Sequence, residues 1–193
     1  VCYYEAFVRR NVIERLKLRN TFFITSENVH LVDKSRIVPA WNDTSYRKEI
    51  IHGYVSDGNA YALGGISGHA GMFSDISDVA TIMHNLLFPS SSSFLKKETI
   101  DYFTRIRNVT QSSRAYGWDT NSDAPAVGTC CGTLAPETFM HTGYTGTLVC
   151  GDPKRKLMSI LLTNRVYPDP ENRQILGVRT QFNTAVQQLY DQL

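Results

Sequence analysis

The segment formed by residues 140–165 constrains the fold of this chain most, because two apolar runs in it flank a turn. Residues 147–150 form the first run, Gly151-Asp152-Pro153 is the turn, and residues 156–165 contain the second run. Apolar segments bounded by Gly, Asp and Pro are typical of paired β-strands. The segment therefore predicts a strand, a tight turn and a second strand, which together form an antiparallel hairpin.

The sequence His141-Thr142-Gly143 stands at the entrance to this hairpin. A hydroxyl beside a glycine at the start of a strand, behind a residue that can be cationic, suits the binding of a substrate along a sheet. Serine acyl-transfer enzymes use Lys-Thr-Gly in this position, together with a Ser-x-x-Lys motif that holds the nucleophile. The run therefore points to serine acyl-transfer chemistry, although a convincing nucleophile motif is absent from the 193 residues.

Two helices are predicted in the first half of the chain. Residues 3–17 carry apolar side chains near one face at helical spacing. A second helix begins at Ser74, a natural N-cap, with Asp75 and Asp78 in the first turn near the positive end of the helix. The apolar positions that we expect to face the interior are Tyr4, Phe7, Val8, Val12 and Leu16 in the first helix, and Ile76, Val79, Ala80, Met83 and Leu87 in the second.

Two more helices are predicted in the second half. Residues 96–105 favour a short helix, and Asp169 followed by Pro170 favours the start of a C-terminal helix, with the aspartate as cap. Helices, an antiparallel hairpin and a covering helix give an α+β, or layered α/β, plan in which helices cover an antiparallel sheet. The apolar face expected on the last helix consists of Ile175, Val178, Phe182, Ala185, Val186 and Leu189.

Length and composition limit the class of protein. A chain of 193 residues can form one ordinary domain, and 42% hydrophobic with 20% charged residues is typical of a globular rather than a disordered protein. The net charge of +2, without a basic stripe, argues against nucleic acid as a partner. No apolar run approaches the roughly 20 residues of a membrane span.

The cysteines and histidines do not predict a metal site. The cysteines lack the paired spacing of zinc sites, and Cys130 and Cys131 are adjacent, so we expect four free or incidentally paired thiols. His30, His52 and His84 share no spacing with acids or cysteines, so we predict no metal and no cofactor. Two triplets, Asn42-Asp43-Thr44 and Asn108-Val109-Thr110, match the N-glycosylation pattern, which would matter only in a eukaryotic secretory context.

Several blocks in order along the chain resemble the serine β-lactamase-like, penicillin-binding family of β-lactamases, D,D-peptidases and related esterases. Arg15 departs from the pattern, because many members carry proline there. The resemblance is closest to the esterase-like branch. The blocks are residues 7–16, 53–65, 68–74 with 78–80, Tyr116-Gly117-Trp118, residues 141–146 and residues 161–166.

The resemblance implies roles for five residues. His141 stands where the family has lysine and would polarise the site; unlike lysine, a histidine ordinarily titrates near pH 6.5. Thr142 would offer its hydroxyl to a substrate carboxylate or carbonyl, and Gly143 would leave room for the acyl chain. The backbone N–H of Tyr144 would form half of the oxyanion hole. His69 would line the cleft rim or make a local loop hydrogen bond, and both alternatives stay open.

The family's serine and tyrosine motifs precede the matched region, so residues 1–193 are expected to be a single partial domain, its C-terminal part. Ser45-Tyr46-Arg47-Lys48 and Ser93-Phe94-Leu95-Lys96 fit Ser-x-x-Lys literally, but neither is expected on the start of a buried helix, where the chemistry needs it. Asn164 and Arg165 could meet an anionic substrate, although a structural ion pair is favoured. The abrupt start at Val1 fits a fragment or a processed product.

The favoured function is therefore part of a serine hydrolase that forms an acyl-enzyme with an ester, an amide or a peptidoglycan-like peptide. A catalytically inactive binding module and an inert truncation are the alternatives. The partners expected are a small-molecule or peptide substrate and the missing N-terminal part of the same domain. We expect no turnover from the chain alone, an unpaired edge on the second hairpin strand, and an extracytoplasmic or secreted location.

Overall fold

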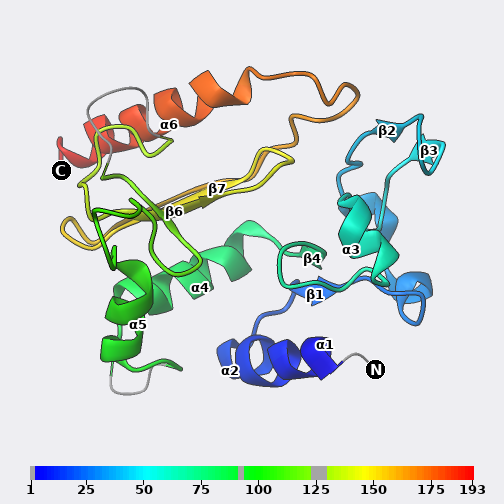
Figure 1. Ribbon diagram of the computed structural model, residues 1–193, viewed down its shortest axis with the longest axis horizontal. Coiled ribbons are helices and arrows are strands. Elements are labelled where there is room, and N and C mark those ends of the chain that lie inside the picture. Colours follow the sequence, from blue (N-terminus) through cyan, green and yellow to red (C-terminus); the bar gives the residue numbers. More distant parts are fainter. Residues whose placement is uncertain (1–2, 91–93, 123–129) are drawn as a thin grey trace. The chain divides into compact units, whose positions relative to one another are not determined.

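The computed structural model describes residues 3–90, 94–122 and 130–193, and the chain forms two compact units (Figure 1). The first contains residues up to 81 together with 164–172, and the second contains residues 82–163 and 173–193. Val1, Ser93 and Cys2, which is one of the four cysteines considered above, lie outside the described residues.

The first unit opens with the predicted N-terminal helix. Helix α1 (Tyr3–Val8) continues through a π-helical turn (Arg9–Ile13) into α2 (Glu14–Leu16), and the helix ends where Lys17 adopts a left-handed backbone conformation. The predicted apolar face is only partly covered, because Val8 is buried whereas Phe7 is exposed.

Short elements follow, as the loop-rich sequence suggests. Strand β1 (Phe22–Phe23) pairs with β4 (Met72–Phe73), and β2 (Asn42–Asp43) pairs with β3 (Glu49–Ile50), both antiparallel. Single 3₁₀ turns at Val29–Leu31 and Lys34–Arg36 and the short helix α3 (Gly58–Ala62) complete the unit.

Helix α4 (Ile76–Leu87) forms as predicted, with Met83 and Leu87 buried, but Ile76 is exposed rather than interior, and the cap differs from the prediction. Asp75, not Ser74, accepts the Asp78 N–H at 2.9 Å and so acts as N-cap. The Ser74 hydroxyl bonds instead to that of Thr21. Asp78 is buried and accepts from the Asn20 N–H at 2.7 Å and from the Thr21 hydroxyl at 2.8 Å. Burial disfavours the charged carboxylate, yet these donors outweigh it and keep the Asp78 pKa below its ordinary value.

The second unit is built on an antiparallel sheet with strand order β5-β6-β7-β8. Its strands are β5 (Asp119–Thr120), β6 (Phe139–Thr142), β7 (Leu148–Asp152) and β8 (Leu157–Leu161). The predicted hairpin is therefore confirmed as β7–β8, with Cys150 opposite Ser159. Helix α5 (Lys97–Thr104) precedes the sheet, and α6 (Ile175–Tyr190) lies along it in Figure 1 and contacts β8.

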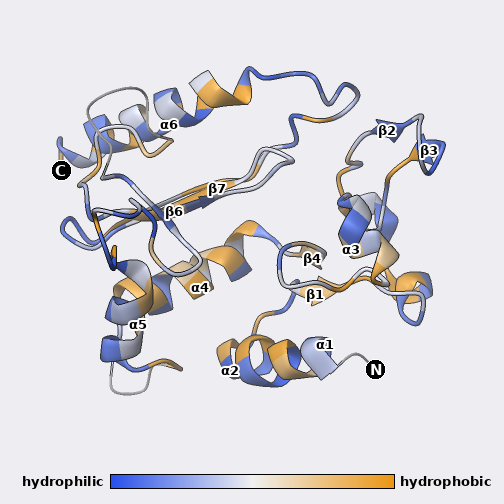
Figure 2. Cartoon of the chain, in the orientation of Figure 1, coloured by the Kyte–Doolittle hydropathy of each residue, from blue (hydrophilic) through white to orange (hydrophobic). Residues whose placement is uncertain are grey.

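The core of this unit includes residues of β7, a strand with hydrophobic stretches in Figure 2. It consists of Leu134, Leu148 and a disulfide between Cys131 and Cys150. The expectation of free or incidentally paired thiols is thereby corrected for these two cysteines: the bond is buried, and it ties the loop before β6 to the centre of β7. Trp118 is half-buried beside this core, with its ring edge-on to the buried Phe139 at 5.0 Å.

Helix α6 corrects two predictions. It begins at Ile175 rather than at Asp169, whose carboxylate caps only a local turn by accepting the Glu171 N–H at 2.9 Å. Its buried face is also different, because Arg179 and Asn183 are buried beside Ile175 while Val178 and Leu189 are exposed.

The buried Asn183 is hydrogen-bonded through its amide nitrogen, whereas its Oδ1 has no partner among the described residues. Asn183 Nδ2 donates to the Cys130 carbonyl oxygen at 2.8 Å and to the Arg179 carbonyl oxygen at 3.0 Å. A buried polar group costs free energy only where its hydrogen bonds are lost. Helix α6 is therefore attached to the sheet unit through polar contacts as well as apolar ones.

Candidate active site

The His-Thr-Gly sequence lies at the end of its own strand. His141 and Thr142 are the last residues of β6, opposite Val149 and Leu148 of β7. The connection between these strands is tight, because Gly143 N–H donates to the Thr147 carbonyl at 2.9 Å. The sequence placed this run before a two-stranded hairpin, and the structure adds β6 as a third strand.

The His141 side chain is exposed, and one of its ring nitrogens is engaged locally. Nδ1 lies 2.9 Å from the Thr142 carbonyl oxygen. A carbonyl can only accept, so the neutral ring carries its proton on Nδ1 and the lone pair on Nε2. Nε2 of the neutral ring is therefore the nitrogen left to accept a hydrogen bond.

Gly143 lies close against the Thr147 side chain across the turn. A Cβ built on this residue would collide with the Thr147 hydroxyl, so a larger residue fits only if that side chain rotates away. Gly146, three residues later, has a φ of 120° and donates its N–H to the Gly143 carbonyl at 3.0 Å. The two glycines thus fix the backbone that carries Tyr144, whose side chain is exposed.

Arg179 of α6 holds this turn from the interior. Its Nη2 donates to the Gly143 carbonyl and to the Thr147 carbonyl, both at 2.8 Å. The residue is only 6% exposed, and within the described ranges it forms no ion pair with a carboxylate. Its Nε has no hydrogen-bond partner there either. Burying a charged group without an ion pair costs free energy. Here the buried guanidinium connects the two ends of the turn, Gly143 and Thr147. The sequence signal for it was a single basic residue within the apolar face of a predicted helix.

A second side chain binds the turn at Gly146. The Thr163 hydroxyl, just after β8, donates to the Gly146 carbonyl at 2.9 Å. The turn after His-Thr-Gly is therefore tied both to α6 and to the chain that follows β8. Supporting hydrogen bonds of this kind are what a preorganised binding site requires.

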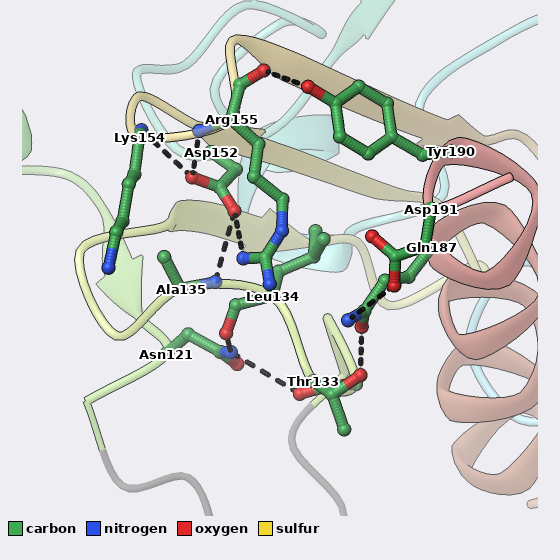
Figure 3. Close-up of polar contacts among 11 residues, drawn as sticks. Asn121, Thr133, Leu134, Ala135, Asp152, Lys154, Arg155, Gln187, Tyr190 and Asp191 are labelled. Carbon is green, nitrogen blue, oxygen red and sulfur yellow. Dashed lines mark hydrogen bonds and ion pairs between the residues drawn. The ribbon is translucent and has the colours of Figure 1, made fainter. Parts of the chain in front are cut away.

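The opposite end of β7 is fixed by a buried carboxylate (Figure 3). Asp152 accepts the backbone N–H groups of Ala135 at 3.0 Å and Lys154 at 2.9 Å. It also accepts from Arg155 through the backbone N–H and through Nη1, each at 3.0 Å. Burial opposes ionisation of Asp152, but these four donors prevail and lower its pKa. The group is structural: it anchors the β7–β8 turn to the loop before β6.

His69 lies in the first unit and makes local hydrogen bonds. Its Nε2 lies 3.0 Å from the Asp57 carboxylate and its Nδ1 lies 2.7 Å from the Ser67 hydroxyl. Asp57 caps α3 by accepting the Ala60 N–H at 2.8 Å, and this bond, followed by the one from His69, lowers the Asp57 pKa. The structure thus shows the loop hydrogen bond that the sequence allowed for His69; a role at a cleft rim stays a prediction.

Comparison with known proteins decides the family. The sequence pattern of the Beta-lactamase family matches residues 3–181. The chain belongs to the beta-lactamase family. A Salmonella agona protein named as a D-alanyl-D-alanine carboxypeptidase is 35% identical over 133 residues, which cover 67% of this chain and 31% of that protein. The resemblance deduced from ordered sequence blocks is therefore confirmed.

Solved structures of beta-lactamase-like proteins confirm the fold. Simvastatin synthase from Aspergillus terreus has a TM-score of 0.70 at 14% identity, covering 98% of this chain and 51% of its own. A beta-lactamase from Mycobacterium bovis has a TM-score of 0.61 at 18% identity, covering 97% and 56%. The chain thus spans about half the length of these structures and about a third of its Salmonella relative.

The first literal Ser-x-x-Lys does not have the geometry of the family's nucleophile. Ser45 lies in a turn, where its backbone N–H and hydroxyl both bond to the Asp43 carboxylate at 3.1 Å. Lys48 has a left-handed backbone with a φ of 56°, so the two residues are not on one helix. The second example contains Ser93, which lies outside the described residues.

The remaining predicted side chains have structural contacts. Arg165 donates to the carbonyl oxygens of Pro170 at 2.7 Å and Asn172 at 2.8 Å, and Asn164 donates to that of Ala40 at 3.2 Å. In residues 3–90, 94–122 and 130–193, no three His, Cys, Asp or Glu side chains gather as metal ligands. Over the same ranges, no helix has the length and apolar character needed to cross a membrane.

Proposed function

We propose that this chain is the C-terminal part of a serine hydrolase domain that acts through an acyl-enzyme on an ester, an amide or a peptidoglycan-type peptide. The observation that supports it most is the end of β6, where His141, Thr142 and Gly143 precede a turn braced by a buried arginine. Because the chain belongs to the beta-lactamase family, we interpret this arrangement as part of an acyl-transfer site.

In this proposal each residue from His141 to Tyr144 has a separate role. His141, through Nε2, assists proton transfer, and Thr142 hydrogen-bonds the substrate. Gly143 lets the acyl group lie along β6. The Tyr144 N–H contributes one oxyanion donor, an interaction typically worth about 10²–10³ in rate. The serine and lysine of the nucleophile motif come from sequence outside this chain.

The sheet supports the view that the domain is partial. Within the described residues, β8 pairs with β7 on one side and with no strand on the other. Proteins seldom leave a central, apolar strand edge open. Since the similar solved structures extend about twice as far, we infer that sequence outside this chain adds strands to β8.

The proposal is tested by labelling the full-length protein that contains this chain with a fluorophosphonate and, separately, with a labelled penicillin. We expect one serine to be labelled, in a Ser-x-x-Lys outside residues 1–193. His141→Ala is expected to slow labelling by about tenfold or more, and His141→Lys to restore part of the rate. His30→Ala, which alters an exposed histidine of the other unit, serves as the matched control.

The outcomes separate the alternatives. A folded full-length protein that is labelled by neither reagent would sink the enzyme proposal and favour a binding module. Where labelling succeeds, hydrolysis of p-nitrophenyl esters is compared with release of D-alanine from a peptide ending in D-Ala-D-Ala. The Salmonella relative's name makes the peptide the first substrate to test.

A further inference from the structure

The triplet Asn108-Val109-Thr110 adopts a defined local turn on the surface of the second unit. Asn108 Oδ1 accepts the Thr110 N–H at 3.0 Å and the Thr110 hydroxyl at 2.7 Å. All three residues are exposed, so space for an attached group exists. In the described part of the chain, the Asn108 amide nitrogen donates to no protein group.

This geometry distinguishes the triplet from the other one in the sequence. Asn42 belongs to strand β2, where it is paired with Ile50, and no hydrogen bond joins it to Thr44 in the described residues. The residue between them, Asp43, is buried and ion-paired with Arg47 at 3.1 Å. At Asn108, by contrast, the middle residue Val109 is 79% exposed. At Asn108 the hydrogen bond from the Thr110 hydroxyl also holds the amide and the hydroxyl of the triplet together.

An exposed aromatic patch is linked to this turn through the residue that precedes it, Arg107. Tyr102, Phe103 and Tyr116 have ring centroids 5.5–5.8 Å apart and are 46%, 48% and 49% exposed. The guanidinium of Arg107, the residue before Asn108, lies 4.0 Å from the centre of the Tyr102 ring. Exposed clusters of large apolar side chains usually have a covering group. The C–H faces of sugar rings stack well on such rings.

The disulfide indicates the compartment in which the modification takes place. The Cys131–Cys150 bond is buried in the core of the same unit. Disulfides of this kind form and persist in oxidising compartments, where N-linked oligosaccharides are also transferred.

We propose that Asn108 carries an N-linked oligosaccharide that covers the patch of Tyr102, Phe103 and Tyr116. The donor is an oligosaccharide joined to a polyprenyl diphosphate. Asn108 Nδ2 forms a bond to the anomeric carbon of the first sugar, the bond from that carbon to the phosphate oxygen breaks, and polyprenyl diphosphate leaves. The amide loses one proton, and nothing is oxidised or reduced. This proposal does not depend on the hydrolase function.

The test is peptide mass spectrometry on the full-length protein purified from the organism that makes it. The sample is treated with peptide N-glycosidase in heavy-oxygen water, which converts a glycosylated asparagine into labelled aspartate. We expect the label at position 108. An unmodified residue 108 in the native protein overturns the proposal, whatever the state of the cysteines.

Variants produced through a eukaryotic secretory pathway check the turn and the patch. Thr110→Ala and Asn108→Gln are expected to abolish the glycan at this site, whereas Thr110→Ser retains it. The two variants without glycan should bind more of a hydrophobic dye than Asn42→Gln, the matched control. Equal dye binding by all three would show that the glycan does not cover the patch and would overturn that part of the proposal.

Discussion

Replacing Arg179 by methionine tests the idea that a buried cation holds the turn after His-Thr-Gly. Methionine keeps the length and the apolar stem but removes both bonds from Nη2, each 2.8 Å long. Hydrogen bonds from a charged donor contribute about 1.5–3 kcal/mol each. The loss is partly offset, because each carbonyl keeps one backbone hydrogen bond. The Gly146 N–H still donates to the Gly143 carbonyl, and the Gly143 N–H still donates to the Thr147 carbonyl.

A second offset comes from the arginine itself. Its Nε is buried without a partner among the described residues, and relief of such a group returns about 1–3 kcal/mol. The net expectation is a loss of about 2 kcal/mol in the free energy of unfolding, or roughly 30-fold in the folding equilibrium constant.

The assay is urea unfolding of the full-length protein, with amide hydrogen exchange at Gly143 and Gly146 as a local readout. Arg173→Met is the matched control, since Arg173 is exposed near the start of the same helix and its loss should change stability by less than about 0.5 kcal/mol. We expect faster exchange at both glycines in Arg179→Met only. If the two variants unfold at the same urea concentration and exchange alike, the reasoning about Arg179 is wrong.

Two further predictions concern the sheet. Asp152→Asn should lower the free energy of unfolding at pH 7 by about 2–3 kcal/mol, because a buried carboxylate with several donors loses its charge. Since the folded pKa of Asp152 is depressed, its contribution is complete above the unfolded pKa of about 3.9 and disappears as pH falls toward the folded pKa. Unfolding curves of variant and parent protein should therefore converge below about pH 4; a constant difference down to pH 2 would contradict the assignment. Gly151→Ala should destabilise by about 1–3 kcal/mol, because the new Cβ would lie 2.6 Å from the Phe139 ring. Gly177→Ala, in the first turn of α6 with no atom within 4 Å of the new Cβ, should instead stabilise by about 0.5–1 kcal/mol, and thermal unfolding of both variants checks that the signs are opposite.

The elements of the fold that depend on local sequence were predictable. Helix α4 and the hairpin β7–β8 have strong periodicity and clear turn residues, so their existence follows from short stretches of sequence. The ordered blocks also identified the family. The cap of α4 was misplaced by one residue because Ser74 and Asp75 are both good caps, and only the contact between Ser74 and Thr21 decides between them.

The features that were missed depend on residues far apart in the chain. Arg179 looked like an interruption of an apolar face, because the carbonyls that it binds lie more than 30 residues away. The Cys131–Cys150 bond could not be chosen over other pairings, since four cysteines allow several. Of the candidate site, the sequence predicted His141, Thr142 and Gly143, whereas the residues that support their turn required the structure.

Strand β8 has a consequence for the order of folding. It is joined to β7 by a local turn, so the hairpin can form within microseconds of its synthesis. If strands outside this chain complete the sheet, the other edge of β8 pairs with strands that are distant in sequence, and closing such a long loop is slow. The hairpin is therefore expected to form early and to keep one edge of unpaired backbone N–H and C=O groups until the rest of the sheet docks. During that interval the protein would depend on chaperones more than its folded stability suggests.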